Sequence, residues 1–97
     1  MPKAYWIGAR MTVTDPDKLK AYAELAGQAV SEYEGRYLAQ GAETKAFEGP
    51  AQARAVIIEF KDMDTAIECH GSTIYQNALK KLDGSVNRDL FVIEGIE

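Results

Sequence analysis

The sequence is poor in cysteine and histidine and has no long apolar run. It contains one residue of each kind, Cys69 and His70. A lone cysteine excludes an internal disulfide and fits a reducing compartment. No apolar run approaches the roughly 20 residues of a membrane span, and the N-terminus lacks the apolar core of a signal peptide. We therefore expect a cytoplasmic protein without a membrane partner.

Positive charge is also scarce. The formal net charge is -4, and the four arginines are scattered along the chain. A phosphate backbone requires a clustered basic surface, so we expect no nucleic-acid partner. The single histidine has no second metal ligand at a recognisable spacing. We expect neither a metal nor a cofactor.

The length of the chain limits its organisation. Its 97 residues, 46% hydrophobic and 27% charged, match one ordinary globular domain over residues 1–97. A chain this short buries only about two thirds of the surface that its unfolded form exposes. Oligomerisation can cover part of the remainder, so a homodimer is favoured.

The first apolar stretch, residues 4–13, reads as a central strand. Side chains alternate between the two faces of a strand. One face is then wholly apolar (Tyr5, Ile7, Ala9, Met11, Val13), and the other is mixed (Ala4, Trp6, Gly8, Arg10, Thr12). Because both faces carry apolar residues, we expect helices on one and a second subunit on the other.

Helix signals follow this strand. Asp15 and Pro16 are typical of a helix start, and apolar residues recur at helical spacing up to Tyr33. Gly35 is then predicted to end the helix in a left-handed conformation. Two short helices are expected later, one opened by Asp62 or Asp64 and broken at Gly71, and one capped by Ser72.

Further strands are expected at residues 36–40, 54–60 and 89–94, with weaker β character at 43–48. The order βαββαβ is the ferredoxin-like pattern, which defines an α+β fold. It places the first and third strands at the centre of a four-stranded antiparallel sheet. Both crossovers then lie on one face, and the opposite face is left open.

Several blocks of the sequence resemble a bacterial family of about 95 residues that is known only as a domain of unknown function. They are AYWIGARMTVTDP, YEGRYLAQG, Glu48-Gly49, Arg54 with Glu59-Phe60, the Ser72 helix start and the closing VIEG. The resemblance covers nearly the whole chain and implies a dimeric α/β barrel. In that superfamily two ferredoxin-like subunits pack sheet to sheet, and a small-molecule pocket lies between each sheet and its helices.

Candidate functional residues fall in two groups. His70 could act as a general base, and aromatic side chains could hold a flat ligand, although both are also common packing residues. Arg54 could hold a carboxylate or form an ordinary surface pair. The ligand-binding candidates are Tyr37, Arg54, His70 and Tyr75, with Tyr22 and Trp6 as further aromatic residues, and the catalytic candidates are His70 and Tyr75. Cys69 does not face His70 on a helix, so these two do not form a nucleophile and base pair.

A second group is expected at the dimer interface: Trp6, Arg10, Ile57, Glu59 and Glu94. The three charged members fall on the mixed faces of neighbouring strands. An unpaired buried charge would cost several kcal/mol, so we expect them to form an ion network.

These features favour a homodimer that binds a small apolar or aromatic ligand between sheet and helices. The alternative is a cofactor-free monooxygenase or isomerase acting on a small organic substrate. A third interpretation is a purely structural module. The Met1-Pro2 start also resembles that of tautomerases, whose amino-terminal proline acts as a base, but the strand order fits that family poorly.

Overall fold

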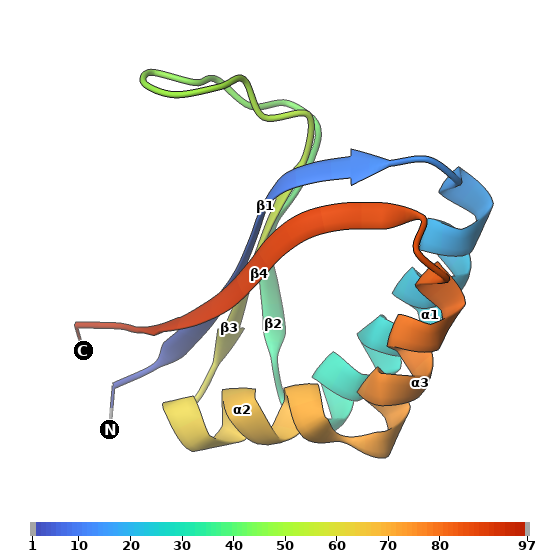
Figure 1. Cartoon of the computed structure of the whole chain (residues 1–97). Coiled ribbons are helices and arrows are strands. Elements are labelled where there is room, and N and C mark those ends of the chain that lie inside the picture. Colours follow the sequence, from blue (N-terminus) through green and yellow to red (C-terminus); the bar gives the residue numbers. More distant parts are fainter. Residues whose placement is uncertain (1, 97) are drawn as a thin grey trace.

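The computed structural model describes residues 2–96 as one sheet with three helices on one side (Figure 1). The elements are β1 (Ala4–Val13), α1 (Pro16–Glu32), β2 (Arg36–Gly41), β3 (Ala55–Phe60), α2 (Met63–Gly71), α3 (Thr73–Leu82) and β4 (Val86–Glu94). The sheet is antiparallel with the order β2-β3-β1-β4. This confirms the predicted ferredoxin-like fold with β1 and β3 at its centre.

The helices begin at the predicted capping residues. The Asp15 carboxylate accepts hydrogen bonds from the backbone N–H groups of Asp17 and Lys18, at 3.1 and 3.2 Å. Asp62 caps α2 in the same way, and Ser72 caps α3. Each cap satisfies amide groups that have no partner within their own helix. The second crossover is therefore divided into two helices at Ser72.

Gly35 was predicted to end α1 in a left-handed conformation, and that prediction is wrong. Glu34 holds the left-handed conformation after α1, with φ of 57°, and Gly35 does not. A Cβ atom at Gly35 would lie 2.7 Å from Val30 Cγ1 and 2.8 Å from Phe60 Cε1. Glycine is needed there because the chain passes directly against the packed side chains of α1 and β3.

The segment between β2 and β3 is not a strand. Residues 43–48 lie in a loop that extends away from the sheet (Figure 1), which corrects the expectation of weak β structure there. The last strand also differs from its prediction, since β4 begins at Val86 and not at Asp89.

A β-bulge divides β1 and resets its alternation. The pairing with β4 shifts between Ala9 and Thr12, and Arg10 has φ of 51°. The Arg10 N–H donates instead to Gln52 Oε1 at 2.7 Å. After a bulge the following side chains point to the opposite face. Met11 is therefore buried beneath α1, not on the face of Tyr5 where the strict alternation placed it.

The two faces of the sheet differ in their cover. On the side that we call the covered face, Ile58, Trp6 and Val92 are neighbours across the strands and pack beneath the helices. We call the opposite side the bare face. Its apolar residues are Tyr5, Ile7, Ile57, Phe91 and Ile93.

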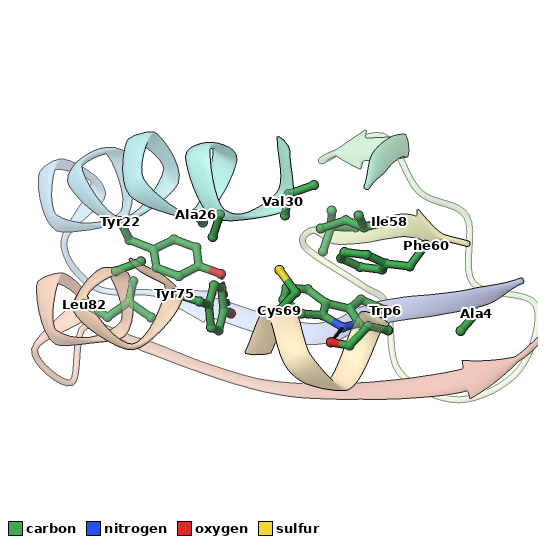
Figure 2. Packing of buried hydrophobic residues seen from close by; sticks show 14 residues of the cluster. Ala4, Trp6, Tyr22, Ala26, Val30, Ile58, Phe60, Cys69, Tyr75 and Leu82 are labelled. Atoms are coloured by element: carbon green, nitrogen blue, oxygen red, sulfur yellow. Dashed lines mark hydrogen bonds between the residues drawn. The ribbon is translucent and has the colours of Figure 1, made fainter. Parts of the chain in front are cut away.

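Trp6 was expected at the dimer interface and lies instead on the covered face (Figure 2). Its Nε1–H donates to the Ala66 carbonyl at 3.1 Å. Its ring centroid is 5.0 Å from those of Phe60 and Tyr75. The strand is apolar on both sides, so the alternation alone could not decide which side the helices cover.

Candidate functional site

A small cavity of about 50 Å³ lies between α1 and the covered face. We call it the arginine cavity. Its lining residues are Met11, Leu19, Tyr22, Ala23, Tyr37, Gln40, Arg54, Val56, Ile58 and Arg88. They come from α1, from all four strands and from the residue just before β3. The site therefore exists only in the folded chain.

Two tyrosines and an arginine form a hydrogen-bonded cluster at this cavity. The hydroxyl oxygens of Tyr22 on α1 and Tyr75 on α3 are 2.7 Å apart, and Figure 2 shows the two side chains facing each other. Arg88 Nη2 donates to both oxygens, at 3.1 and 3.2 Å. The guanidinium carbon also lies 5.0 Å from the centroid of the Tyr22 ring, within cation–π range.

Burial favours the protonated form of two phenol groups in this region, Tyr75 and Tyr37. Tyr75 is 0% exposed, and burial raises the pKa of its hydroxyl far above the usual value. Burial likewise raises the pKa of Tyr37. Both hydroxyls therefore remain neutral hydrogen-bond donors, and Arg88 keeps its charge because guanidinium does not deprotonate in proteins.

A second cavity, of about 250 Å³, lies between α2 and β4. We call it the histidine cavity. Its lining is apolar apart from one imidazole: Trp6, Ala66, Ile67, His70, Leu90, Phe91 and Val92. The His70 ring centroid is 5.1 Å from that of Tyr75 and 6.0 Å from that of Trp6. No carboxylate belongs to this lining, so nothing in it would orient His70 as a general base.

The structure does not bring the four predicted ligand residues together. Tyr37 and Arg54 line the arginine cavity, whereas His70 lines the histidine cavity. Tyr75 lines neither cavity and is buried between them, in contact with Tyr22 and His70. Arg88 was not among the predicted site residues, and it lies in the first part of β4, before the predicted start of that strand at Asp89.

Cys69 is not placed for nucleophilic chemistry. It is buried in the core, and burial raises the pKa of its thiol to about 11. The thiol is therefore almost wholly protonated at neutral pH, and the thiolate is the reactive form. Within residues 2–96 no three His, Cys, Asp or Glu side chains gather as a metal site. Met1, on which the tautomerase interpretation rests, lies outside the described residues.

The ion network predicted for the dimer interface does not form within the chain. Arg10 pairs with Asp89 at 2.6 Å, and not with either predicted glutamate. Glu59 lies on the bare face between Lys3, at 3.5 Å, and Arg36, at 3.4 Å. Glu94 is opposite Ala4 in the sheet, and therefore belongs to the other face. Sequence position indicated neighbouring strands, but register and the bulge determine which charges meet.

The fold and its cavities define a ferredoxin-like α+β protein. A model of the family named domain of unknown function DUF1330 matches residues 3–96. The chain belongs to this family, as the resemblance indicated. No match was found among curated proteins.

Three solved structures are similar in fold. A protein of unknown function from Rhodopseudomonas palustris is 17% identical with a TM-score of 0.75, and the match covers 99% of this chain and 84% of that one. SnoaB, a cofactor-independent oxygenase from Streptomyces nogalater, is 8% identical with a TM-score of 0.70, over 100% and 96%. A dimeric protein of unknown function and ferredoxin-like fold from Bacteroides fragilis is 13% identical with a TM-score of 0.63, over 95% of each chain.

No helix within residues 2–96 combines the length and the apolar character needed to span a lipid bilayer.

Proposed function

We propose that this protein binds a small organic molecule at the arginine cavity and acts as a homodimer that buries the bare face. The observation that carries the binding role is the composition of the arginine cavity. Apolar side chains such as Leu19 and Ile58 stand beside the polar groups of Tyr22, Tyr37 and Arg88. Ligand sites typically combine an apolar wall with a few convergent polar groups.

The size of the cavity limits what enters it. A water molecule needs roughly 10–15 Å³ of such space, and the arginine cavity has about 50 Å³. One small polar group of the ligand fits inside. The remainder of the ligand would then lie outside the cavity, against its rim.

The homodimer is supported by the bare face. Phe91 is 50% exposed and Ile93 is 53% exposed, and they continue the apolar surface of Tyr5, Ile7 and Ile57. The ion pairs of Arg10 and Glu59 lie around this apolar centre. An apolar centre with a polar rim is the usual anatomy of an interface. A second copy is the occupant because one such patch can complement itself across a two-fold axis.

The enzymatic alternative is not favoured by the geometry. A cofactor-free oxygenase or isomerase would need its acid, base and binding groups at one reacting centre. His70 and Arg54 instead line different cavities, and Tyr75 reaches neither. The likeness to SnoaB, at 8% identity, shows a common fold.

Screening by NMR tests the binding role. A panel of small neutral and charged organic compounds is added to ¹⁵N-labelled protein, and shifted backbone signals are mapped. We expect the largest shifts at Leu19, Tyr22, Tyr37 and Arg88, since these residues line one cavity. The role is refuted if no compound binds, or if the shifts gather around His70 and Ile67 instead.

A further inference from the structure

We propose that the arginine cavity recognises the carboxylate group of its ligand. This inference rests on the proposed binding function and names the chemical class of the ligand. It is carried by the pairing of the arginines, by the absence of acid from the cavity lining and by the hydrogen-bond arrangement of the tyrosine cluster.

The arginines of the chain divide into two pairs. Arg10 pairs with Asp89, and Arg36 pairs with Glu59. Among residues 2–96, neither Arg54 nor Arg88 forms an ion pair, and these are the two that line the arginine cavity. The two guanidinium groups without a carboxylate partner therefore share one cavity.

The cavity lining holds no negative charge. Its polar groups are the two guanidinium groups, the Gln40 amide and the hydroxyls of Tyr22 and Tyr37. A half-buried positive charge without a counterion is costly, whereas an anion beside it offsets that cost. Two such charges make the cavity selective for an anion over a neutral molecule of the same shape.

The donors of Arg88 are only partly used. Both of its hydrogen bonds, to Tyr22 and Tyr75, come from Nη2. A guanidinium has five N–H donors in a planar fork, so the Nη1 and Nε groups can serve a ligand. A carboxylate has two oxygens in one plane and matches this fork.

The two phenols provide a further donor. They share one hydrogen bond, and both oxygens also accept from Arg88, so only one of the two phenol protons is used between them. Tyr75 is wholly buried and lines neither the arginine cavity nor the histidine cavity, while Tyr22 lines the arginine cavity. When Tyr75 donates to Tyr22, the Tyr22 proton is free to donate to a carboxylate oxygen.

Matched acids and amides test this inference directly. Acetate, butyrate and benzoate are compared with acetamide, butyramide and benzamide by NMR titration of the intact protein at low salt. Each pair has nearly the same shape and differs in charge. We expect the acids to bind at least tenfold more tightly than their amides, with unchanged affinity from pH 6 to pH 9.

Arginine variants locate the effect. Arg88→Met should weaken carboxylate binding at least tenfold, and Arg54→Met should do so severalfold. Arg10→Met is the matched control because it removes the same charge from the bare face, and it should leave carboxylate affinity unchanged. If Arg88→Met does not fold, Arg54→Met carries the test, since Arg54 forms no ion pair within residues 2–96.

The outcomes separate the two proposals. Equal binding of acids and amides at the arginine cavity would overturn the carboxylate inference and leave the binding role intact. Carboxylate binding that weakens equally in Arg10→Met and Arg54→Met would also overturn it, since this marks a general charge effect. Failure of every acid and every amide to bind would overturn both.

Discussion

The two faces of the sheet carry the same kinds of apolar residue but differ in how much of each side chain is exposed to solvent. Phe60 on the covered face is 1% exposed, whereas Phe91 on the bare face is 50% exposed. Ile58 is buried beneath the helices, and its neighbour Ile57 is only partly covered. The difference shows that the chain supplies cover for one face and leaves the other apolar.

The two faces also differ in the partners of their arginine side chains. On the bare face, Arg10 and Arg36 each meet a carboxylate of the chain. On the covered face, Arg88 donates to the phenol oxygens of Tyr22 and Tyr75, and Arg54 lines the same cavity. The arginines of the bare face are thus paired with carboxylates, but its apolar side chains are exposed. The covered face is packed beneath helices, but its two arginines have no carboxylate partner within residues 2–96. The proposed second copy would cover the first face, and the proposed ligand would supply a carboxylate to the second.

The largest effect is expected from truncating the same residue type on each face. Phe60→Ala should lower the free energy of unfolding by about 3–5 kcal/mol, because it empties a closed core. Phe91→Ala should act mainly through the dimer. Urea unfolding at several protein concentrations measures both changes. The loss in Phe60→Ala should be the same at every concentration, and that in Phe91→Ala should depend on it.

The proposed difference between the two faces would be contradicted if both variants lost the same free energy of unfolding at every protein concentration. Phe91 would then stabilise the single chain alone, and the bare face would have no partner.

A charge at the centre of the bare face should separate the subunits. Ile57→Glu would place a carboxylate at the centre of the proposed apolar interface. We expect the dissociation constant of the dimer to rise at least about 100-fold, measured by sedimentation equilibrium. Ile67→Glu is the matched control because Ile67 is 55% exposed on α2, outside the sheet. Equal effects in the two variants would argue against an interface at Ile57.

Adding one methyl group should distinguish packed from open positions. Gly35→Ala should destabilise the fold by about 1–3 kcal/mol, because the new Cβ would meet Val30 and Phe60. Gly27→Ala in α1 has nothing within 4 Å and should stabilise the fold by roughly 0.5–1 kcal/mol. Thermal unfolding of the two variants checks the opposite signs. A neutral Gly35→Ala would show that the covered face is not closely packed there.

The smallest effect is expected at Ser85, between α3 and β4. Its side-chain hydroxyl is buried and has no hydrogen-bond partner within residues 2–96. Its backbone carbonyl accepts from Thr14, and its N–H donates to Leu82, so the backbone role survives substitution. Ser85→Ala should leave stability unchanged or raise it by up to about 1 kcal/mol. A loss of more than 1 kcal/mol in urea unfolding would reveal a partner for the hydroxyl.

Local signals were sufficient for most of the fold. Asp15 and Ser72 were predicted to cap helices because capping depends on residues a few positions apart, and both caps are confirmed. Of the two candidates for the start of α2, Asp62 and Asp64, the cap is Asp62. The strand order followed from the succession of elements, since ferredoxin-like topology leaves few arrangements. The β-bulge at Arg10 could not be foreseen, because a positive φ in arginine has no sequence signature.

The candidate site was only partly predictable. Tyr37 and Arg54 were predicted to bind a ligand, and both line the arginine cavity. Arg88 was missed because its partners Tyr22 and Tyr75 are distant in sequence and meet it only after α1 and α3 have packed. Trp6 was assigned to the wrong face for a similar reason. A strand that is apolar on both sides shows that both need cover, but not which cover each receives.

Sedimentation velocity of the unmodified chain at micromolar concentration tests the contrast between the faces most directly. We expect a single species with twice the 10.7 kDa mass of the chain, because a second copy would cover the bare face. A single species of 10.7 kDa, with Ile57 and Phe91 accessible to solvent, would contradict it.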